Sequence, residues 1–210
     1  MVLKLFSCLL AFAAAPVLAQ TAPAPVPATQ PAPALPRVAL TTSAGTVVVE
    51  VDNVHAPITG NNFLRYVDQK RLDGAIFYRV AKVQDHFGFV QFGVQNAPAK
   101  ILPPIKHEPT TTTGIKHLDF TLSQPRNKPG SAQGEFTIML GDQTAGMDAD
   151  PSKPGDNLGY AAFAHVVDGK DIVLKIFDAP NSPDATIRGA FKGEVPVAPV
   201  KILTARRVKP

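Results

Sequence analysis

The sequence of 210 residues contains little cysteine, little charge and no long apolar run. Cys8 is its only cysteine, which excludes an intrachain disulfide framework. The formal net charge is only +4 and the basic residues are spread along the chain, whereas a nucleic-acid binder usually carries a basic stripe or a recognisable motif. The apolar run from Leu5 to Ala15 is well short of the roughly 20 residues that span a bilayer, which argues against a membrane anchor.

The N-terminus has instead the pattern of a secretory signal peptide. A short positive start that contains Lys4 precedes the apolar run, and small residues up to Ala19 suit cleavage before Gln20. We therefore expect residues 1–19 to be removed, no stable membrane insertion after cleavage, and a periplasmic or secreted mature protein. Cys8 lies in the removed segment, so the mature protein carries no thiol and oxidising conditions leave its stability unchanged.

Residues 20–36 are mostly alanine and proline and carry no charge. Such a composition cannot build a core, and proline keeps the chain extended, so we expect a semi-rigid linker. A proline-rich ligand for a partner's groove is the alternative. Since 45% of the residues are hydrophobic, the remaining 37–210 can bury one good core, which predicts one folded domain.

The domain alternates strand patterns with turn signals. Strands are expected at 38–42, 46–51, 75–80, 88–93, 120–123, 135–140, 159–166 and 200–208, and helices at 56–69 and 170–177. Punctuated stretches at 82–87, 96–113 and 141–156 are expected to be loops. Many strands with only two short helices predict a mainly β fold, a closed antiparallel barrel with helices over its ends.

One strand carries the candidate chemistry. In the stretch 75–80, the alternation of apolar and polar residues predicts that Phe77 and Arg79 leave the backbone on one side and Tyr78 on the other. An arginine would then stand on a rigid platform, with Gln91 of the next strand as a polar neighbour. A surface arginine on an edge strand is the alternative for this residue taken alone.

The order of motifs resembles that of the cyclophilin family of peptidyl-prolyl cis-trans isomerases, and within it the secreted bacterial members. The motifs are Thr41-Thr42-Ser43-Ala44-Gly45, Ala56-Pro57 with Asn62-Phe63, Phe77-Tyr78-Arg79-Val80, Val90-Gln91 with Gly93, Leu122-Ser123, Pro129-Gly130-Ser131-Ala132 before Glu135-Phe136, and Phe163-Ala164-His165-Val166-Val167-Asp168-Gly169. Each is weak alone, but seven in the right order from Arg37 to Arg207 are specific. The resemblance implies a closed eight-stranded antiparallel β-barrel capped by two α-helices.

The resemblance also implies the chemistry. Rotation about an X-Pro bond is slow because resonance gives its C–N bond double-bond character, with a barrier of roughly 18–20 kcal/mol. Arg79 matches the family's catalytic arginine, whose guanidinium can hydrogen-bond the twisted amide more strongly than the planar one. Lowering the barrier by about 7 kcal/mol gives on the order of a 10⁵-fold acceleration. No nucleophile, metal, cofactor or proton transfer is required.

The family's substrate contacts fall on further residues. Gln91 matches the residue that positions the arginine and the substrate carbonyl, and Arg126 matches a position whose backbone holds the substrate chain. The expected residues of the proline pocket are Phe136, Phe87 or Phe89, Leu158 and Tyr160. For Phe136 and Leu158, an ordinary core role is the alternative.

The chain also departs from the family. Thr137 stands where a second pocket phenylalanine is usual, which could forfeit on the order of 1–3 kcal/mol of apolar contact with substrate. Gln124 and Pro125 replace a Met-Ala pair, and Phe92 replaces a glycine. The chain has no tryptophan, which the members most sensitive to cyclosporin carry at the pocket rim, so we expect weak binding of that drug.

The sequence gives little support for a metal site, a serine hydrolase site or a calcium loop. The five histidines show no metal-ligand spacing and are expected in loops or at the surface, and Ser123 and Ser131 lack a Gly-x-Ser-x-Gly setting. Asp148 and Asp150 lack the glycine and the glutamate of a calcium loop.

The expected partners are proline-containing segments of unfolded or partly folded exported proteins, bound by a monomer. The alternatives are a non-catalytic proline-peptide binding module or chaperone and, more distantly, a barrel that holds a small apolar ligand.

Overall fold

The structure is a computed structural model that describes residues 34–209. The predicted signal peptide, Cys8 and all of the predicted linker except residues 34–36 lie outside the described residues. Between residues 34 and 209, no helix combines the length and the apolar character needed to cross a membrane.

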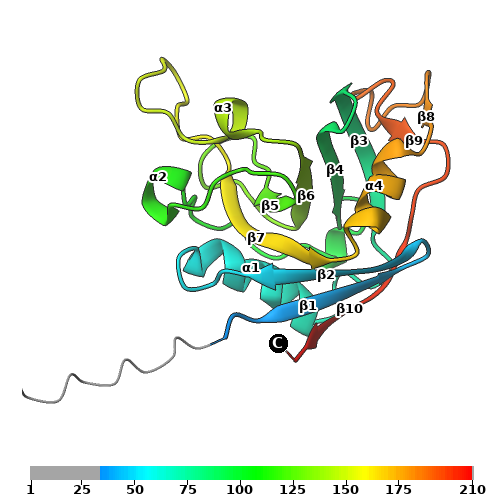
Figure 1. Ribbon diagram of the computed structural model, residues 1–210, viewed down its shortest axis with the longest axis horizontal. Helices are drawn as coiled ribbons and strands as arrows, with labels where there is room; N and C mark the ends of the chain where they lie inside the picture. The colour runs from blue at the N-terminus through cyan, green and yellow to red at the C-terminus, as the bar shows by residue number, and fades with distance from the viewer. Residues whose placement is uncertain (1–33, 210) are drawn as a thin grey trace, which may run out of the picture. The chain divides into compact units, whose positions relative to one another are not determined.

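Eight strands form one antiparallel sheet in the order β10-β1-β2-β7-β5-β6-β4-β3 (Figure 1). The strands are β1 (Arg37–Thr42), β2 (Gly45–Val51), β3 (Ile76–Gln84), β4 (Phe87–Gly93), β5 (Thr121–Gln124), β6 (Glu135–Leu140), β7 (Ala161–Asp168) and β10 (Ile202–Val208). A second sheet pairs β8 (Asn181–Ser182) with β9 (Val195–Pro196). The mainly β prediction is confirmed, and each long strand expected from alternation is present.

The sheet is an open half-barrel, so the prediction of a closed barrel is wrong. Its edge strands β10 and β3 meet through one isolated bridge, Ile76 to Lys201, and a few backbone hydrogen bonds such as that from Phe77 N–H to the Val200 carbonyl, 2.9 Å. Farther along β3, the Val80 N–H donates instead to the carbonyl of Glu194, 2.7 Å. The segment before β10 therefore occupies the edge of β3 that a closed barrel would give to β10.

Between residues 34 and 209, four α-helices accompany the sheet, where two were predicted. The expected helices are α1 (Pro57–Asp68) and α4 (Lys170–Asp178). Two single turns, α2 (Thr110–Thr113) and α3 (Thr144–Met147), lie in the stretches predicted to be loops, and a 3₁₀ turn, η1, covers Pro98–Lys100. A helix of four residues is too short to show a period of 3.6 residues in the sequence, which is why the pattern did not reveal α2 and α3.

Helix α1 begins with the help of a distant side chain. No neighbouring side chain caps its first turn, although Pro57 suits that position. The buried carboxylate of Glu108 accepts hydrogen bonds from the backbone N–H of Ile58, 3.0 Å, and of Thr59, 2.6 Å. Glu108 thus supplies both the capping acceptor and a negative charge at the positive end of the helix.

The core lies between the sheet and the apolar sides of α1 and α4. Phe63 of α1 packs on Phe136 of β6 with ring centroids 5.0 Å apart and on Phe163 of β7 at 5.4 Å. Phe77 of β3 and Phe92 of β4 continue this aromatic cluster at 4.9 Å. All five rings are fully buried. The core therefore fixes the inner face of β3, β4 and β6 and leaves their outer face for other uses.

Strands β3 and β4 form a long hairpin where the sequence predicted an inserted loop at 82–87. The strands run to Gln84 and from Phe87, so only Asp85 and His86 form the turn. His86 takes a left-handed conformation with φ of 47°. The end of β3, Lys82 to Gln84, is exposed on both faces. Its sequence therefore lacks the alternation of apolar and polar residues by which a strand is recognised, which is why a loop was predicted.

Candidate active site

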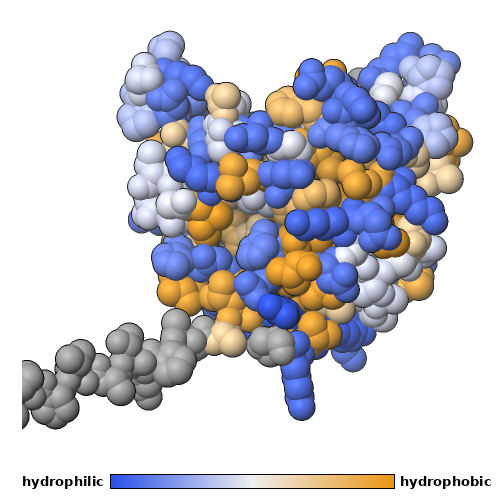
Figure 2. All heavy atoms as spheres, in the orientation of Figure 1, coloured by the Kyte–Doolittle hydropathy of each residue, from blue (hydrophilic) through white to orange (hydrophobic). Residues whose placement is uncertain are grey.

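A cavity of about 600 Å³ lies on the face of β3, β4 and β6 that points away from the core. Its lining residues are Tyr78, Arg79, Phe89, Gln91, Gln95, Ile101, Pro125, Arg126, Asn127, Ser131, Gln133, Gly134, Glu135, Thr137, Met139, Met147, Tyr160, Arg188 and Phe191. Figure 2 shows the surface hollowed between two raised flanks, the loop after α3 and the end of the β3–β4 hairpin with the segment before β9.

A β-bulge turns Arg79 into this cavity. Phe77 pairs with Phe92, yet Arg79 pairs with Gln91, so β3 has one extra residue, Tyr78, at this point. Phe77 consequently lies in the core while both Tyr78 and Arg79 line the cavity. The prediction that Phe77 and Arg79 share one side of the strand is wrong, because the bulge shifts the alternation by one residue.

The guanidinium of Arg79 is held from several sides. Its Nη1 donates to Gln91 Oε1, 3.2 Å, and its Nε donates to Glu194 Oε2, 2.5 Å. Its Cζ atom lies 4.9 Å from the ring centre of Phe89 and 3.8 Å from that of Phe191. The side chain is only 19% exposed. The group is thus oriented and partly desolvated before any ligand binds.

Six of the nine predicted site residues line the cavity: Arg79, Gln91, Phe89, Arg126, Thr137 and Tyr160. Arg126 is fixed by Asp156, with Nη1 to Oδ2 at 2.5 Å, and by the carbonyl of Gly159, to which Nε donates at 3.0 Å. Its side chain is only 5% exposed and lies over the Tyr160 ring. Arg126 therefore shapes the cavity wall with its charge already paired.

Phe136, Phe87 and Leu158 do not line the cavity. Phe136 is fully buried in the core, because β6 alternates and Thr137 is the residue that faces outward. Phe87 lies on the same face as Phe89 but farther toward the hairpin turn. Leu158 is 38% exposed, and its carbonyl lies 3.0 Å from His107 Nε2. Of the two phenylalanines left open by the sequence, Phe89 is the one beside Arg79.

Several lining residues were not anticipated from the sequence. Glu135 and Met139 flank Thr137 at a spacing of two, so strand alternation could have found them. Arg188 and Phe191, which line the cavity, lie in the stretch between β8 and β9, which has no periodic pattern. Glu194, which accepts a hydrogen bond from Arg79, lies in the same stretch. No sequence signal placed that stretch beside Arg79.

Two buried acidic groups share a hydrogen bond in the cavity wall. The hydroxyl of Tyr78 donates to Glu135 Oε2, 2.6 Å. Burial raises the pKa of Glu135 to about 7, although the hydrogen bond from Tyr78 and the charge of Arg188 oppose the rise. Burial and the neighbouring Glu135 carboxylate raise the pKa of Tyr78 as well. The charge in this part of the cavity therefore changes near neutral pH.

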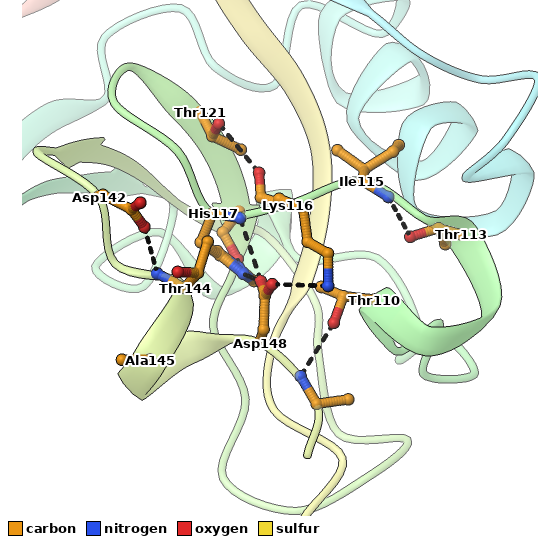
Figure 3. Close-up of polar contacts among 12 residues, drawn as sticks. Thr110, Thr113, Ile115, Lys116, His117, Thr121, Asp142, Thr144, Ala145 and Asp148 are labelled. Carbon is orange, nitrogen blue, oxygen red and sulfur yellow. Dashed lines mark hydrogen bonds and ion pairs between the residues drawn. The ribbon is translucent and has the colours of Figure 1, made fainter. Parts of the chain in front are cut away.

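A buried polar network lies beneath the cavity, centred on His117. Its Nδ1 lies 2.7 Å from Asp148 Oδ1 and its Nε2 lies 2.8 Å from Ser123 Oγ. Figure 3 shows Lys116 and His117 converging on Asp148, with Lys116 Nζ 3.2 Å from Oδ2. His117 lies in the loop between α2 and β5, one of the two settings predicted for the histidines, but its side chain is fully buried. Burial lowers the pKa of His117 against the opposing effect of Asp148.

This network is not an accessible nucleophile site. Ser123 is buried and does not line the cavity. Its carbonyl accepts a hydrogen bond from Thr137 Oγ1, 3.2 Å, so the network supports the strand that carries Thr137. Within residues 34–209, no group of three or more His, Cys, Asp or Glu side chains is arranged to hold a metal ion.

Comparison with known proteins identifies the family. The family model described as cyclophilin-type peptidyl-prolyl cis-trans isomerase matches residues 37–207. A peptidyl-prolyl cis-trans isomerase of Streptomyces antibioticus is 34% identical over 80% of this chain and 96% of its own length. One of Acinetobacter baylyi is 31% identical over 80% of this chain and 84% of its own length.

A solved structure supports the fold. A cyclophilin-type peptidyl-prolyl cis-trans isomerase of Cryptosporidium parvum, studied in the presence of the dipeptide Ala-Pro, aligns with a TM-score of 0.63. The alignment covers 83% of this chain and 99% of that protein at 17% identity, so it speaks for the fold alone. Together, the matched residues and the relatives show that this chain belongs to the cyclophilin family of peptidyl-prolyl cis-trans isomerases.

Proposed function

We propose that this isomerase acts through Arg79, which stabilises the half-rotated X-Pro amide. Twisting the amide restores a lone pair on the prolyl nitrogen, and a guanidinium N–H can donate to it or to the carbonyl oxygen as it swings. The main observation behind this proposal is the position of the Arg79 guanidinium at the cavity wall, where Gln91 Oε1 accepts from it at 3.2 Å and the Phe89 ring flanks it. Its charge is fixed at physiological pH, so the step needs no proton transfer.

The proline ring is proposed to sit beside Phe89, Met139 and Thr137, which line the same stretch of cavity on β4 and β6. The Thr137 hydroxyl donates its hydrogen to the carbonyl of Ser123, so its donor is already used within the protein. Thr137 is therefore a smaller wall than phenylalanine but not a strongly polar one. This supports an isomerase that binds the proline ring more weakly but still turns it over, and not a protein without a proline site.

The substrate class is proposed to be proline-containing segments of unfolded or partly folded exported proteins. The open cavity and its Arg126 and Tyr160 wall suit an extended chain better than an enclosed small molecule. The N-terminal pattern supports export, with a signal peptide at 1–19, a linker at 20–36 and a monomeric isomerase domain at 37–210. On this view the protein works in the periplasm or outside the cell.

The test is an isomerisation assay on an X-Pro peptide with wild type, Arg79→Ala and Arg65→Ala. Arg65 is exposed on α1 and is the matched control for loss of a guanidinium elsewhere. We expect Arg79→Ala to lose at least a hundredfold in kcat/KM and Arg65→Ala to retain wild-type activity. An inactive wild type that still binds the peptide would instead support a non-catalytic binding module.

A further inference from the structure

The stretch Ile187–Glu194, here called the 187–194 turn, is built as a defined structure against the active site. Ile187 and Ala190 exchange two backbone hydrogen bonds, 2.8 and 2.9 Å, around Arg188 and Gly189, which both have positive φ, 51° and 80°. Two consecutive left-handed residues are the mark of a tight primed hairpin turn. The stretch is therefore more than a loose surface loop.

Both ends of the 187–194 turn are tied to the walls of the cavity. The Val80 N–H donates to the Glu194 carbonyl, 2.7 Å, and the Asn181 side-chain amide donates to the carbonyls of Gly193, 3.0 Å, and Val80, 2.9 Å. At the other end, Arg188 Nη2 donates to the carbonyl of Gln95, 2.8 Å. The turn thus spans from β3 to the segment after β4.

Two side chains of the turn act directly on Arg79. Glu194 accepts from Nε at 2.5 Å, and the Phe191 ring lies 3.8 Å from Cζ. Phe191 is 41% exposed, lines the cavity and holds a left-handed φ of 59°, a conformation that is costly for an aromatic residue. An exposed aromatic ring kept in strained backbone beside a guanidinium points to a use other than packing.

Two of the three guanidinium nitrogens of Arg79 donate to protein groups, and the third is left for a ligand. Within the part of the chain that the structure describes, Nε is taken by Glu194 and Nη1 by Gln91, while Nη2 makes no hydrogen bond. A guanidinium has five N–H donors in one plane, so hydrogen bonds from Nε and from Nη1 to two different partners fix that plane and leave Nη2 for another acceptor. The orientation of the guanidinium is therefore set partly from outside the eight-stranded sheet.

We propose that two residues of the 187–194 turn are working parts of the isomerase site: Glu194 is a positioning residue that orients Arg79, and Phe191 is a wall against which the substrate packs beside the guanidinium. Phe191 supplies aromatic surface on the cavity that Thr137 does not. This inference rests on the proposed role of Arg79. It adds to that role two residues that come from outside the strands carrying Arg79, Gln91 and Thr137.

The experiment compares Glu194→Ala, Glu194→Gln, Phe191→Ala, Phe191→Leu and the control Lys192→Ala, all in the same X-Pro assay. Lys192 lies in the same turn with its side chain in solvent, paired only with the exposed Asp184 at 3.2 Å. Folding of each variant is checked by its thermal transition. Peptide affinity is measured separately by NMR titration.

For Glu194→Ala we expect kcat to fall on the order of tenfold with little change in KM, because the guanidinium loses its orientation. Glu194→Gln keeps an acceptor for Nε and should recover most of that loss. For Phe191→Ala we expect KM and the peptide Kd to rise on the order of tenfold with kcat retained, and Phe191→Leu to fall between it and wild type. Lys192→Ala should match wild type.

A rise in kcat/KM for Glu194→Ala would overturn the proposal, since the carboxylate would then restrain Arg79 and not position it. Unchanged kinetics and affinity in both alanine variants would overturn it as well. These outcomes are distinct from failure of the proposed function, which would appear as turnover in wild type that does not depend on Arg79. Even if turnover did not depend on Arg79, an unchanged peptide Kd in Phe191→Ala would contradict the proposal that substrate packs against Phe191.

Discussion

The Tyr78 hydroxyl and Glu135 Oε2 lie 2.6 Å apart in the wall of the active-site cavity, both largely shielded from water. The bulge that brings Arg79 into the cavity also brings Tyr78 there, so one distortion of β3 places a cation and a hydroxyl side by side. Glu135 faces them from β6. The site thus contains a fixed positive charge at Arg79 and a titrating carboxyl group.

The first prediction concerns the pH dependence of stability at Glu135. Burial raises its pKa from the ordinary 4.5 to about 7 in the folded protein, so between these values the folded state binds more protons than the unfolded state. Its contribution to the free energy of unfolding is therefore full below about pH 4.5 and is lost as pH rises through 7, by about 3 kcal/mol at most.

Glu135→Gln removes this titration. Urea unfolding of wild type and variant at pH 5 and pH 8 measures it, and the stability difference between the two proteins should change in favour of the variant at the higher pH. A difference that stays constant across this range would show that Glu135 keeps an ordinary pKa.

The second prediction concerns His117, the centre of the buried network with Asp148 and Ser123. His117→Ala leaves both partners buried without it and opens a void, so we expect a loss of about 2–4 kcal/mol in the free energy of unfolding. Denaturant unfolding near pH 7.5 measures the loss. His165→Ala is the control, because that histidine is exposed and should cost little.

His117 also predicts sensitivity to acid. Its pKa is lowered in the folded protein, chiefly by burial, so the unfolded chain takes up a proton first as pH falls. The stability it contributes is present above the ordinary histidine pKa of about 6.5 and decreases below it. Midpoints measured from pH 7.5 to pH 5 should fall in wild type more steeply than in His117→Ala. Parallel curves would contradict this assignment.

The fourth prediction concerns the cap of α1. Glu108→Ala removes the acceptor of the Ile58 and Thr59 N–H groups and of the Thr59 hydroxyl, 2.7 Å, at a buried position. We expect a loss of about 1–3 kcal/mol in the free energy of unfolding, with isomerase activity retained because Glu108 does not line the cavity. Denaturant unfolding alongside the X-Pro assay checks both parts. A large loss of activity in a folded variant would point to a role beyond the cap.

The fifth prediction concerns Thr137. Thr137→Phe places an aromatic ring into a cavity with room for it, and we expect X-Pro peptide affinity to improve by about 1–3 kcal/mol. Thr137→Val is the control, since it removes only the hydroxyl that bonds to the Ser123 carbonyl. NMR titration with one peptide compares the three proteins. Equal affinities would show that the proline ring does not contact this position.

Much of the site was predictable because its residues repeat a local pattern or a family motif. Arg79, Gln91 and Thr137 were predicted by such motifs, and the structure brings their side chains to one cavity. Phe136 was assigned to the pocket although strict alternation with Thr137 argues for the core. That error lay in giving the motif more weight than the two-residue period of the strand.

Other features had no local signal. A β-bulge changes which face a side chain takes without changing the composition of the strand, so the sequence wrongly predicted that Tyr78 and Arg79 lie on opposite sides. The burial of His117 depends on Asp148 and Ser123, which approach it only once the sheet has formed. The contact between His117 and Asp148, which are 31 residues apart, is a property of the folded chain.

By itself the sequence determined the mainly β class, the two long helices, the family and a candidate catalytic arginine, because alternation, helical spacing and ordered motifs are local properties. Only the tertiary structure decided that the sheet stays open between β10 and β3, and that Glu194 and Phe191 meet Arg79. Glu194 is 115 residues from Arg79 in the chain. Contacts at that separation arise from the packing of whole elements, which no short window of sequence contains.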